Sequence, residues 1–182
     1  MNNDILDIEE PILINDILPV NENLSMLHIL SETPGWIMQN EANINRFDSA
    51  FTNDYPETGW GLVAAEKGHK NFYDTNLNVI AHIISSLVCH KCNIKKIRGI
   101  ERIHWNYYRK GQEGVGHVDR EGDNYISILY NPLTTDGGTE IKKVFYPDVL
   151  GQAKVFKSNW LHRGVTTKKD KSRVSLNIIL EL

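Results

Sequence analysis

The residues best suited to chemistry in this sequence are a histidine and an aspartate two positions apart. His117 and Asp119 stand in "GHVDREGDNY", directly after a segment that alternates like a β-strand, "GIERIHWNYY". In an extended backbone, side chains at positions i and i+2 project to the same side. An imidazole and a carboxylate on one side are two ligands of a metal ion, but the pair also occurs in exposed turns. A third ligand elsewhere in the chain would favour the metal site.

His162 is the best candidate for that third ligand. It lies in "NWLHRGV", directly after the predicted strand "AKVFKS". Two histidines and one carboxylate bind a non-haem ferrous ion on one face and leave the opposite face open for a co-substrate and oxygen. Five other histidines compete for the place: His28, His69, His82, His90 and His104. From these residues alone, a ferrous site and a chance grouping stay open as alternatives.

The final strand offers a binding group for an anion. In "RVSLNIIL", Arg173, Ser175 and Asn177 alternate with apolar residues, so one face of the strand is polar and the other is apolar. An arginine with a hydroxyl two residues further along forms a fork that suits a dicarboxylate. The alternation predicts that the apolar face packs against helices while the polar face lines a cavity. The alternative is a strand whose polar face lies in solvent.

Composition limits the classes of function. The chain has 182 residues, of which 41% are hydrophobic and 24% are charged, which is typical of one soluble globular domain spanning 1–182. The net charge of −3 provides no general basic surface for nucleic acid. The apolar runs are too short to span a bilayer, and the acidic N-terminus lacks the pattern of a secretory signal. We therefore expect a cytoplasmic protein with neither nucleic acid nor a membrane as its partner.

Cys89 and Cys92 in "CHKC" are the only cysteines of the chain. Such a pair is either a redox pair or half of a zinc site, and a structural zinc site needs four ligands. The sequence holds no second pair of ligands at the spacing of a zinc site. We therefore expect two reduced thiols near the end of a helix, and their role stays open.

The periodicity changes from helical to strand-like near residue 96. The first half contains a predicted strand at 11–18, a predicted helix at 21–32 and a stronger helical pattern at 75–91. The second half predicts five short strands: "IRGIERIHWNYYR", "NYISILYN", "EIKKVFYP", "QAKVFKS" and "SRVSLNIILEL". This order indicates an α+β protein in which residues 1–95 supply one strand and helical support and residues 96–182 form a jelly-roll core.

Four segments of the second half resemble, in the right order, the 2-oxoglutarate/Fe(II)-dependent dioxygenase superfamily. The similarity is to its prolyl 4-hydroxylase-like branch, which includes small members from bacteria and phages, and it runs from about Arg102 to Leu182. The segments carry a tyrosine with the HxD block, a strand with a Gly-Gly turn, the strand before the distal histidine and a closing strand with a basic residue: "NYYRKGQEGVGHVD", "SILYNPLTTDGGTEI", "GQAKVFKSNWLHRGV" and "SRVSLNIIL". The first hundred residues carry no comparable resemblance.

The resemblance implies a double-stranded β-helix (a jelly-roll) with supporting helices. It implies Fe(II) as the cofactor, held by His117, Asp119 and His162, and 2-oxoglutarate as the co-substrate, with ascorbate as an optional further cofactor. The protein would use 2-oxoglutarate and O2 to hydroxylate a C–H bond, with release of succinate and CO2. Its substrate would be a prolyl residue in a protein or peptide.

The resemblance also assigns the co-substrate's binding residues. The C5 carboxylate of 2-oxoglutarate would pair with Arg173, assisted by Ser175 or Tyr130. A tyrosine before the HxD block would contact the co-substrate too, and we favour Tyr108 over Tyr107 because it shares strand parity with polar residues. The distal histidine and the basic residue are eleven positions apart here, slightly more than in many members. Three lysines in the turn between them are alternative anchors: Lys168, Lys169 and Lys171.

Three other functions compete with prolyl hydroxylation. One is hydroxylation of a free amino acid or another small metabolite. A second is demethylation of an alkylated nucleic-acid base, which is disfavoured because that branch carries a second arginine near the end of the closing strand and "NIILEL" has none. A third is a binding module that kept the fold, which predicts a broken triad or a missing anchor. We expect substrate choice to depend on the N-terminal half and on residues 46–70, including Tyr55 and Trp60.

Overall fold

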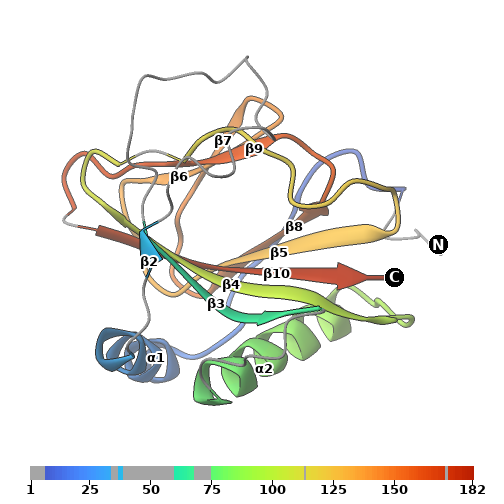
Figure 1. The fold of residues 1–182 in the computed structure, drawn as a ribbon, viewed down its shortest axis with the longest axis horizontal. Coiled ribbons are helices and arrows are strands. Elements are labelled where there is room, and N and C mark those ends of the chain that lie inside the picture. Colours follow the sequence, from blue (N-terminus) through green and yellow to red (C-terminus); the bar gives the residue numbers. More distant parts are fainter. Residues whose placement is uncertain (1–6, 34–36, 39–59, 68–74, 113, 171) are drawn as a thin grey trace.

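Two antiparallel sheets lie face to face, and two helices cover the outer face of the larger sheet (Figure 1). This computed structural model describes residues 7–33, 37–38, 60–67, 75–112, 114–170 and 172–182. The helices come from the first half of the chain, and most of the sheet residues come from the second half. The predicted α+β architecture with helices outside a β core is confirmed.

The larger sheet has seven strands in the order β1-β8-β5-β10-β4-β3-β2, and all neighbouring pairs are antiparallel. The last strand of the chain, β10, lies at its centre, where it pairs with β4 along its length and with β5 over its second half. The bounds of the strands are β1 Ile12–Ile14, β2 Ile37–Met38, β3 Trp60–Glu66, β4 Gly99–Arg109, β5 Tyr125–Asn131, β8 Gln152–Lys157 and β10 Ser172–Glu181.

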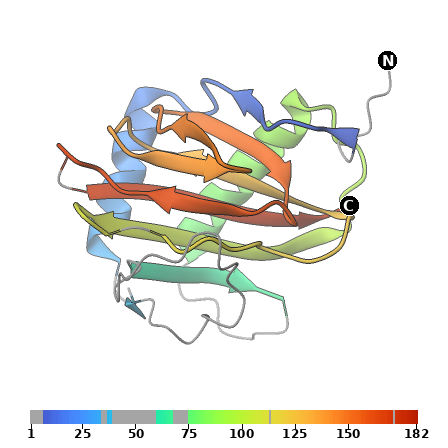
Figure 2. The same cartoon turned by 90° about the horizontal axis from the view of Figure 1, so that it is seen from above.

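The smaller sheet lies on the side of the larger sheet that faces away from the helices (Figures 1 and 2). Its order is β7-β6-β9, with β6 spanning Gly138–Ile141, β7 Val144–Pro147 and β9 His162–Val165. An isolated antiparallel bridge between His117 and His162 adds the segment after β4 to the edge of β9. The space between the two sheets is therefore bordered by β4, β5, β8 and β10 on one side and by β6, β9 and this segment on the other.

Two amphipathic helices bury the outer face of the larger sheet. They are α1, Val20–Glu32, and α2, Thr75–Lys91, which match the helices predicted from periodicity. On α2 the fully buried residues recur at helical spacing and join the main core cluster: Leu77, Ala81, Ile84 and Val88. No helix in the described part of the chain is long and apolar enough to cross a membrane.

Strand alternation separates the apolar core from the polar interior between the sheets. On β5, Ile126 and Ile128 belong to the core under the helices, whereas Ser127 contacts the polar interior. On β10, the buried leucine and isoleucine side chains at 176, 178 and 180 face the helices in the same way. Arg173 and Asn177, on the other face of β10, contact polar groups of the interior, as the alternation in the sequence predicted.

Several elements differ from the sequence-based predictions. Residues 140–147, expected as one strand, form the β6–β7 hairpin, because Lys142 and Lys143 adopt positive φ angles of 50° and 69° that suit a tight hairpin turn. The strand predicted at 11–18 is shorter, and β2, β3 and β9 were not predicted. Most of the segment 46–70 lies outside the described residues, including Tyr55.

The packing predicts a large difference between two isoleucines. Ile128 is fully buried at the centre of β5, so Ile128→Ala should lower the free energy of unfolding by about 2–5 kcal/mol through lost burial and an incompletely filled cavity. Ile83 is 48% exposed on α2, so Ile83→Ala should change it by less than about 0.5 kcal/mol. Urea denaturation followed by circular dichroism measures both, and equal losses would contradict this assignment of the core.

Candidate metal centre

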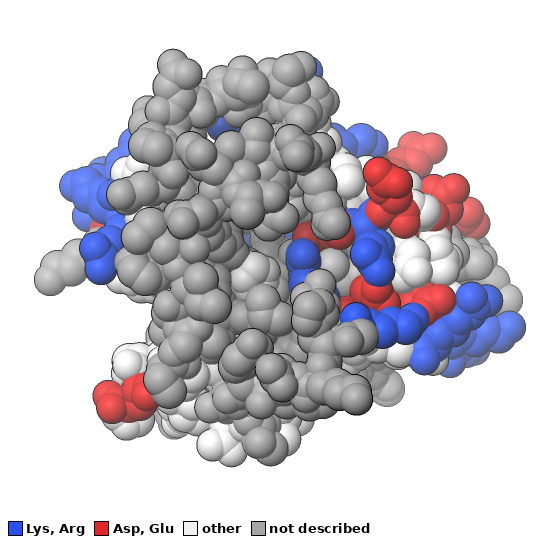
Figure 3. All heavy atoms as spheres, viewed as in Figure 1, with Lys and Arg blue, Asp and Glu red and all other residues white. Residues whose placement is uncertain are grey.

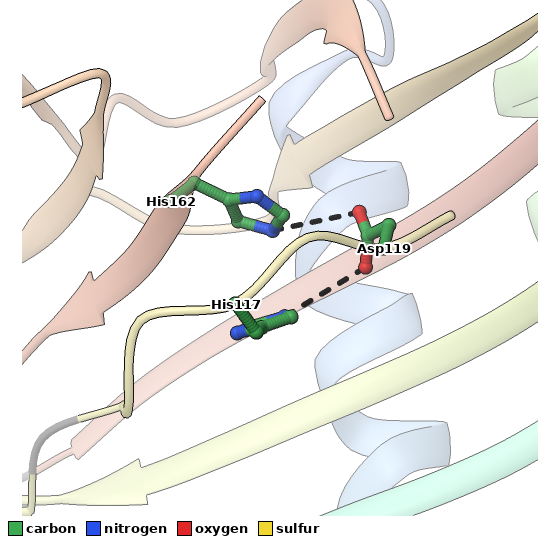
Figure 4. Close-up of side chains that lie close together, drawn as sticks. All are labelled: His117, Asp119 and His162. Atoms are coloured by element: carbon green, nitrogen blue, oxygen red, sulfur yellow. Dashed lines mark ion pairs between the residues drawn. The ribbon is translucent and has the colours of Figure 1, made fainter. Parts of the chain in front are cut away.

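Three side chains from two distant segments converge in the space between the sheets. His117 and Asp119 come from the segment between β4 and β5, and His162 is the first residue of β9. The Nε2 atoms of His117 and His162 lie 3.7 Å and 3.5 Å from the two carboxylate oxygens of Asp119 (Figure 4). One potential ligand atom from each residue lies within 4.8 Å of the others. The predicted grouping of His117, Asp119 and His162 is therefore confirmed.

Backbone pairing brings the two histidines together. The amide nitrogen of each donates to the carbonyl oxygen of the other at 2.9 Å, which is the bridge that joins the two segments. The two imidazole ring centroids lie 4.5 Å apart. No other histidine of the described residues joins the group.

The tautomer of both histidines is set by their own backbone. Nδ1 of His117 lies 2.9 Å from the carbonyl oxygen of Val115, and Nδ1 of His162 lies 2.9 Å from that of Trp160. Because a carbonyl oxygen only accepts, Nδ1 carries the proton in each ring and Nε2 keeps its lone pair. Burial lowers the pKa of His162 to about 4, so this ring is neutral at neutral pH and needs no deprotonation to bind a metal.

Asp119 is held by donors from three strands of the larger sheet. Ser127 Oγ on β5 donates to Oδ2 at 2.6 Å, Asn177 Nδ2 on β10 lies 2.9 Å from both oxygens, and Arg102 Nη2 on β4 donates to Oδ1 at 2.7 Å. Burial raises the pKa of Asp119, but the imidazoles of His162 and His117 and the Arg102 guanidinium outweigh it and hold the pKa well below its usual range. The carboxylate is therefore ionised.

This donor set fits a divalent first-row metal. Two imidazole lone pairs and one carboxylate on one side form a facial set of three, which leaves the remaining coordination positions to other molecules. Among the described residues, no other group of three or more histidine, cysteine, aspartate or glutamate side chains has ligand atoms placed to hold a metal. The set lacks thiolates, so its chemistry suits ferrous iron better than a structural zinc site.

A buried arginine lies on the same polar face of the larger sheet. Arg173 on β10 is 2% exposed, and its guanidinium carbon lies 5.4 Å from the ring centroid of Tyr108, its partner residue on β4. Its Nη2 donates to Thr139 Oγ1 at 2.8 Å and its Nε donates to Asp148 Oδ2 at 2.7 Å. A fixed, buried guanidinium of this kind is suited to binding a carboxylate.

Solved structures similar to this chain share its fold at low sequence identity. The carbocyclase SnoK from nogalamycin biosynthesis, described as non-heme and alpha ketoglutarate dependent, has a TM-score of 0.70 and 9% identity, covering 100% of this chain and 84% of its own. A Pseudomonas putida prolyl-4-hydroxylase has a TM-score of 0.63 and 12% identity, covering 95% and 93%. The 2OG complex of the viral collagen prolyl hydroxylase vCPH from Paramecium Bursaria Chlorella virus-1 has a TM-score of 0.55 and 14% identity, covering 98% and 100%.

The chain has the fold of the 2-oxoglutarate/Fe(II) oxygenases. No protein-family model and no curated protein sequence matches it. The matches in structure cover almost the whole chain, so they include the first hundred residues, which carry no resemblance in sequence. This oxygenase fold and the His117, Asp119 and His162 metal-binding triad agree with the resemblance of the second half.

The oxygenase fold places the predicted co-substrate residues on two different faces of the sheet. Tyr108 and Ser175 share the polar face of Arg173, and Tyr107 lies on the opposite face of β4 beside Val174, which packs against the core. The expectation for Tyr130 is wrong, because strand parity turns its ring into the core under the helices, where its hydroxyl donates to Asn23.

Two of the three lysines considered as alternative anchors, Lys168 and Lys169, lie in the exposed turn before β10. The backbone amides of Lys168 and Lys169 donate to the Asp136 carboxylate, which fixes the turn before β10, and both side chains lie in exposed residues. Lys171 lies outside the described residues.

Sequence reasoning missed the residues that support the site. The sequence did not identify the two residues that hold Asp119, which are Arg102 and Ser127. It also did not identify the two residues near Arg173, which are Asp148 and Lys154. A partial signal existed for Lys154, because it is a lysine within an otherwise buried short strand, "QAKVFK". The contacts of the other residues depend on pairings between distant strands that spacing alone does not define.

The two cysteines behave as reduced thiols. Cys89 is buried at the end of α2 and Cys92 is half-buried, and neither forms a disulfide. Burial raises the pKa of both thiols, that of Cys92 to about 11, so neither is a reactive thiolate at neutral pH. This agrees with the expectation of reduced thiols near a helix end.

The geometry predicts that metal binding needs His162. His162→Ala removes one of three metal ligands. Loss of a residue that only supports a ligand weakens metal binding by up to about 100-fold, so loss of the ligand itself should cost more than that. The probe is Co(II), a spectroscopic substitute for Fe(II). His82→Ala, on the exposed side of α2, should bind as the unaltered protein does. Titration followed by visible absorption measures both, and equal affinities would contradict the triad.

Asn177 should orient the carboxylate ligand. Asn177→Leu keeps the branched shape and the number of heavy atoms but removes both hydrogen bonds to Asp119, so Co(II) affinity should fall about 10–100-fold while the fold is kept. The matched control is Asn21→Leu, at an exposed position of α1. If calorimetric titration gives the same affinity for the Asn177 variant and the unaltered protein, Asn177 has no orienting role.

Proposed function

We propose that this protein is an Fe(II)- and 2-oxoglutarate-dependent oxygenase that hydroxylates a C–H bond. The observation that carries the proposal is the placement of the His117, Asp119 and His162 triad and of buried Arg173 in one space between the sheets of this fold. A metal site and a carboxylate-binding arginine on the same polar face are what a keto acid needs to bind through both of its ends. Bound Fe(II) and 2-oxoglutarate would supply the activation of O2, with succinate and CO2 as the co-products.

Each residue has a separate task in this proposal. The two histidines would present neutral Nε2 atoms to the metal, and Asp119 would supply one negative charge that Arg102, Ser127 and Asn177 keep in place. Arg173 would bind the C5 carboxylate of 2-oxoglutarate and so set the position of its keto group at the metal. Tyr108 and Ser175 stand beside Arg173 and would complete that carboxylate site.

The substrate that we favour is a prolyl residue in a protein or peptide. Its support is the resemblance of the second half to the prolyl 4-hydroxylase-like branch and the similarity in fold to a bacterial and a viral prolyl hydroxylase. A small molecule is the second candidate, because the carbocyclase from nogalamycin biosynthesis has the highest TM-score of the three structures compared above. Where the described residues are visible in Figure 3, basic and acidic side chains lie next to one another.

An anaerobic titration tests the activity class directly. Adding Fe(II) and then 2-oxoglutarate should produce the metal-to-ligand charge-transfer absorption of a chelated keto acid. Release of succinate in air, measured with proline-containing peptides and separately with free amino acids, then distinguishes the two substrate classes. Absence of the absorption band at saturating Fe(II) and 2-oxoglutarate would contradict the proposal.

Arg173→Met should remove the anchor of the co-substrate. Loss of a buried charged partner costs about 3 kcal/mol, so 2-oxoglutarate affinity should fall about 100-fold or more. Co(II) affinity reports whether the variant keeps its fold and should stay unchanged. Arg98→Met is the control, because the Arg98 side chain is 71% exposed and its guanidinium forms a surface ion pair with Glu181. Equal 2-oxoglutarate affinity in the two variants would rule out Arg173 as the anchor.

A further inference from the structure

A second buried cation lies near Arg173 and has no task in the proposed mechanism. Lys154 stands in the middle of β8, and its side chain is fully buried. A lysine is almost never fully buried unless it is paired, because removing an ammonium group from water is costly. Its position therefore needs an explanation in the groups that surround it.

Lys154 is linked to Arg173 through a shared aspartate. Its Nζ lies 3.9 Å from Asp148 Oδ1 and donates to Asn131 Oδ1, and the amide of Asn131 donates back to Asp148 Oδ1 at 2.8 Å. The other oxygen of Asp148 accepts from Thr135 Oγ1 at 2.9 Å and from Arg173 Nε at 2.7 Å. One buried carboxylate is thus placed between two buried cations.

The charges of this cluster do not cancel. Arg173 and Lys154 contribute two positive charges and Asp148 contributes one negative charge, so the cluster keeps one net positive charge. Without the ammonium of Lys154, the Arg173–Asp148 pair would carry no net charge, and it would attract an anion less strongly. The distal carboxylate of a keto diacid carries the one negative charge that balances the cluster.

The guanidinium also keeps one side available for a ligand. Its hydrogen bonds to the described residues use Nε and Nη2, while Nη1 lies against Gly164 on β9. A Cβ at Gly164 would stand 2.9 Å from Nη1 and 3.3 Å from the Tyr108 ring, so a side chain there would crowd both. The glycine leaves room beside Nη1, the edge of Arg173 that does not bind Asp148.

We propose that Lys154 is a positioning residue for the co-substrate: through Asp148, it keeps Arg173 electrostatically available to the distal carboxylate of 2-oxoglutarate. The inference rests on the proposed function and deepens it. Lys154 acts on Arg173 through Asp148 rather than by contact with the co-substrate. The cluster Lys154–Asp148–Arg173 is then one unit whose net charge sets the affinity for the acid.

The cluster should make co-substrate binding sensitive to pH. Burial lowers the pKa of Lys154 to about 8. The negative charge of Asp148 raises this pKa and the positive charge of Arg173 lowers it, but burial has the largest effect. Among the described residues, these two are the charged groups that act on Lys154, and its partner residues on β1 and β5, Leu13 and Leu129, are neutral. Lys154 is mostly protonated at pH 7 and loses its proton as the pH rises past 8, so the affinity for 2-oxoglutarate should fall over that range.

A charge-rescue experiment tests the inference. Counting Lys154, Asp148 and Arg173, the cluster carries a net charge of +1 in the unaltered protein. The net charge becomes 0 in Lys154→Met and +2 in Asp148→Asn, and it returns to +1 in the double variant. The dissociation constant of 2-oxoglutarate is measured anaerobically by calorimetry with Co(II) bound, from pH 6.5 to 9. Lys154→Met should weaken binding about tenfold at pH 7, as expected for loss of one nearby charge. The double variant should recover most of that loss and show no fall in affinity above pH 8.

Two controls separate positioning from a merely structural role. Pyruvate, which has the keto acid group but no distal carboxylate, should bind all four proteins equally, and Co(II) affinity should be the same in all four. The inference is overturned if Lys154→Met binds 2-oxoglutarate as well as the unaltered protein does, or if the double variant binds no better than Lys154→Met. If the unaltered protein itself binds no 2-oxoglutarate, the proposed function fails first, so the two failures are distinguishable.

Discussion

The buried carboxylate of Asp119 is the interaction on which the site depends. It accepts hydrogen bonds from residues on β4, β5 and β10, which are three neighbouring strands of the larger sheet, although Asp119 itself lies in the segment that borders the smaller sheet. A buried charge without such partners would be strongly destabilising, so the carboxylate and the strands constrain each other. The same contacts that tie the segment to the sheet also keep the carboxylate ionised and directed at the two imidazoles.

The two faces of β10 show how stability and chemistry share one strand. Its side chains at 174, 176, 178 and 180 join the core under the helices, while Arg173, Ser175 and Asn177 project into the space between the sheets. A shift of one residue in the pairing of this strand would exchange the two sets, placing a guanidinium in the hydrophobic core. The hydrophobic core therefore also sets the register of the polar site, and the central position of β10 between β4 and β5 fixes that register from both sides.

The sequence predicted the triad because strand parity and local spacing are visible in a single chain. The helices at 21–32 and 75–91 and the polar face of β10 were predicted for the same reason. Tyr130 was assigned to the wrong face, although Ile126 and Ile128 share its parity and belong to the core, so a stricter use of alternation would have avoided the error. The β6–β7 hairpin was missed because Lys142 and Lys143 are unusual residues at positive φ. The pairing of Asp148 with Arg173 and Lys154 depends on contacts between distant strands, which no local pattern encodes.

The backbone bridge between His117 and His162 has a consequence for how the protein would acquire its ion. Two segments separated by a long stretch of chain are already joined by main-chain hydrogen bonds, and each ring is oriented by a carbonyl two residues before it. The entropy cost of closing the loop between His117 and His162 is therefore already part of forming the sheet, and metal binding does not add to it. An apoprotein built in this way is a preformed receptor, which captures its metal without refolding, in contrast to small domains whose folding requires the metal.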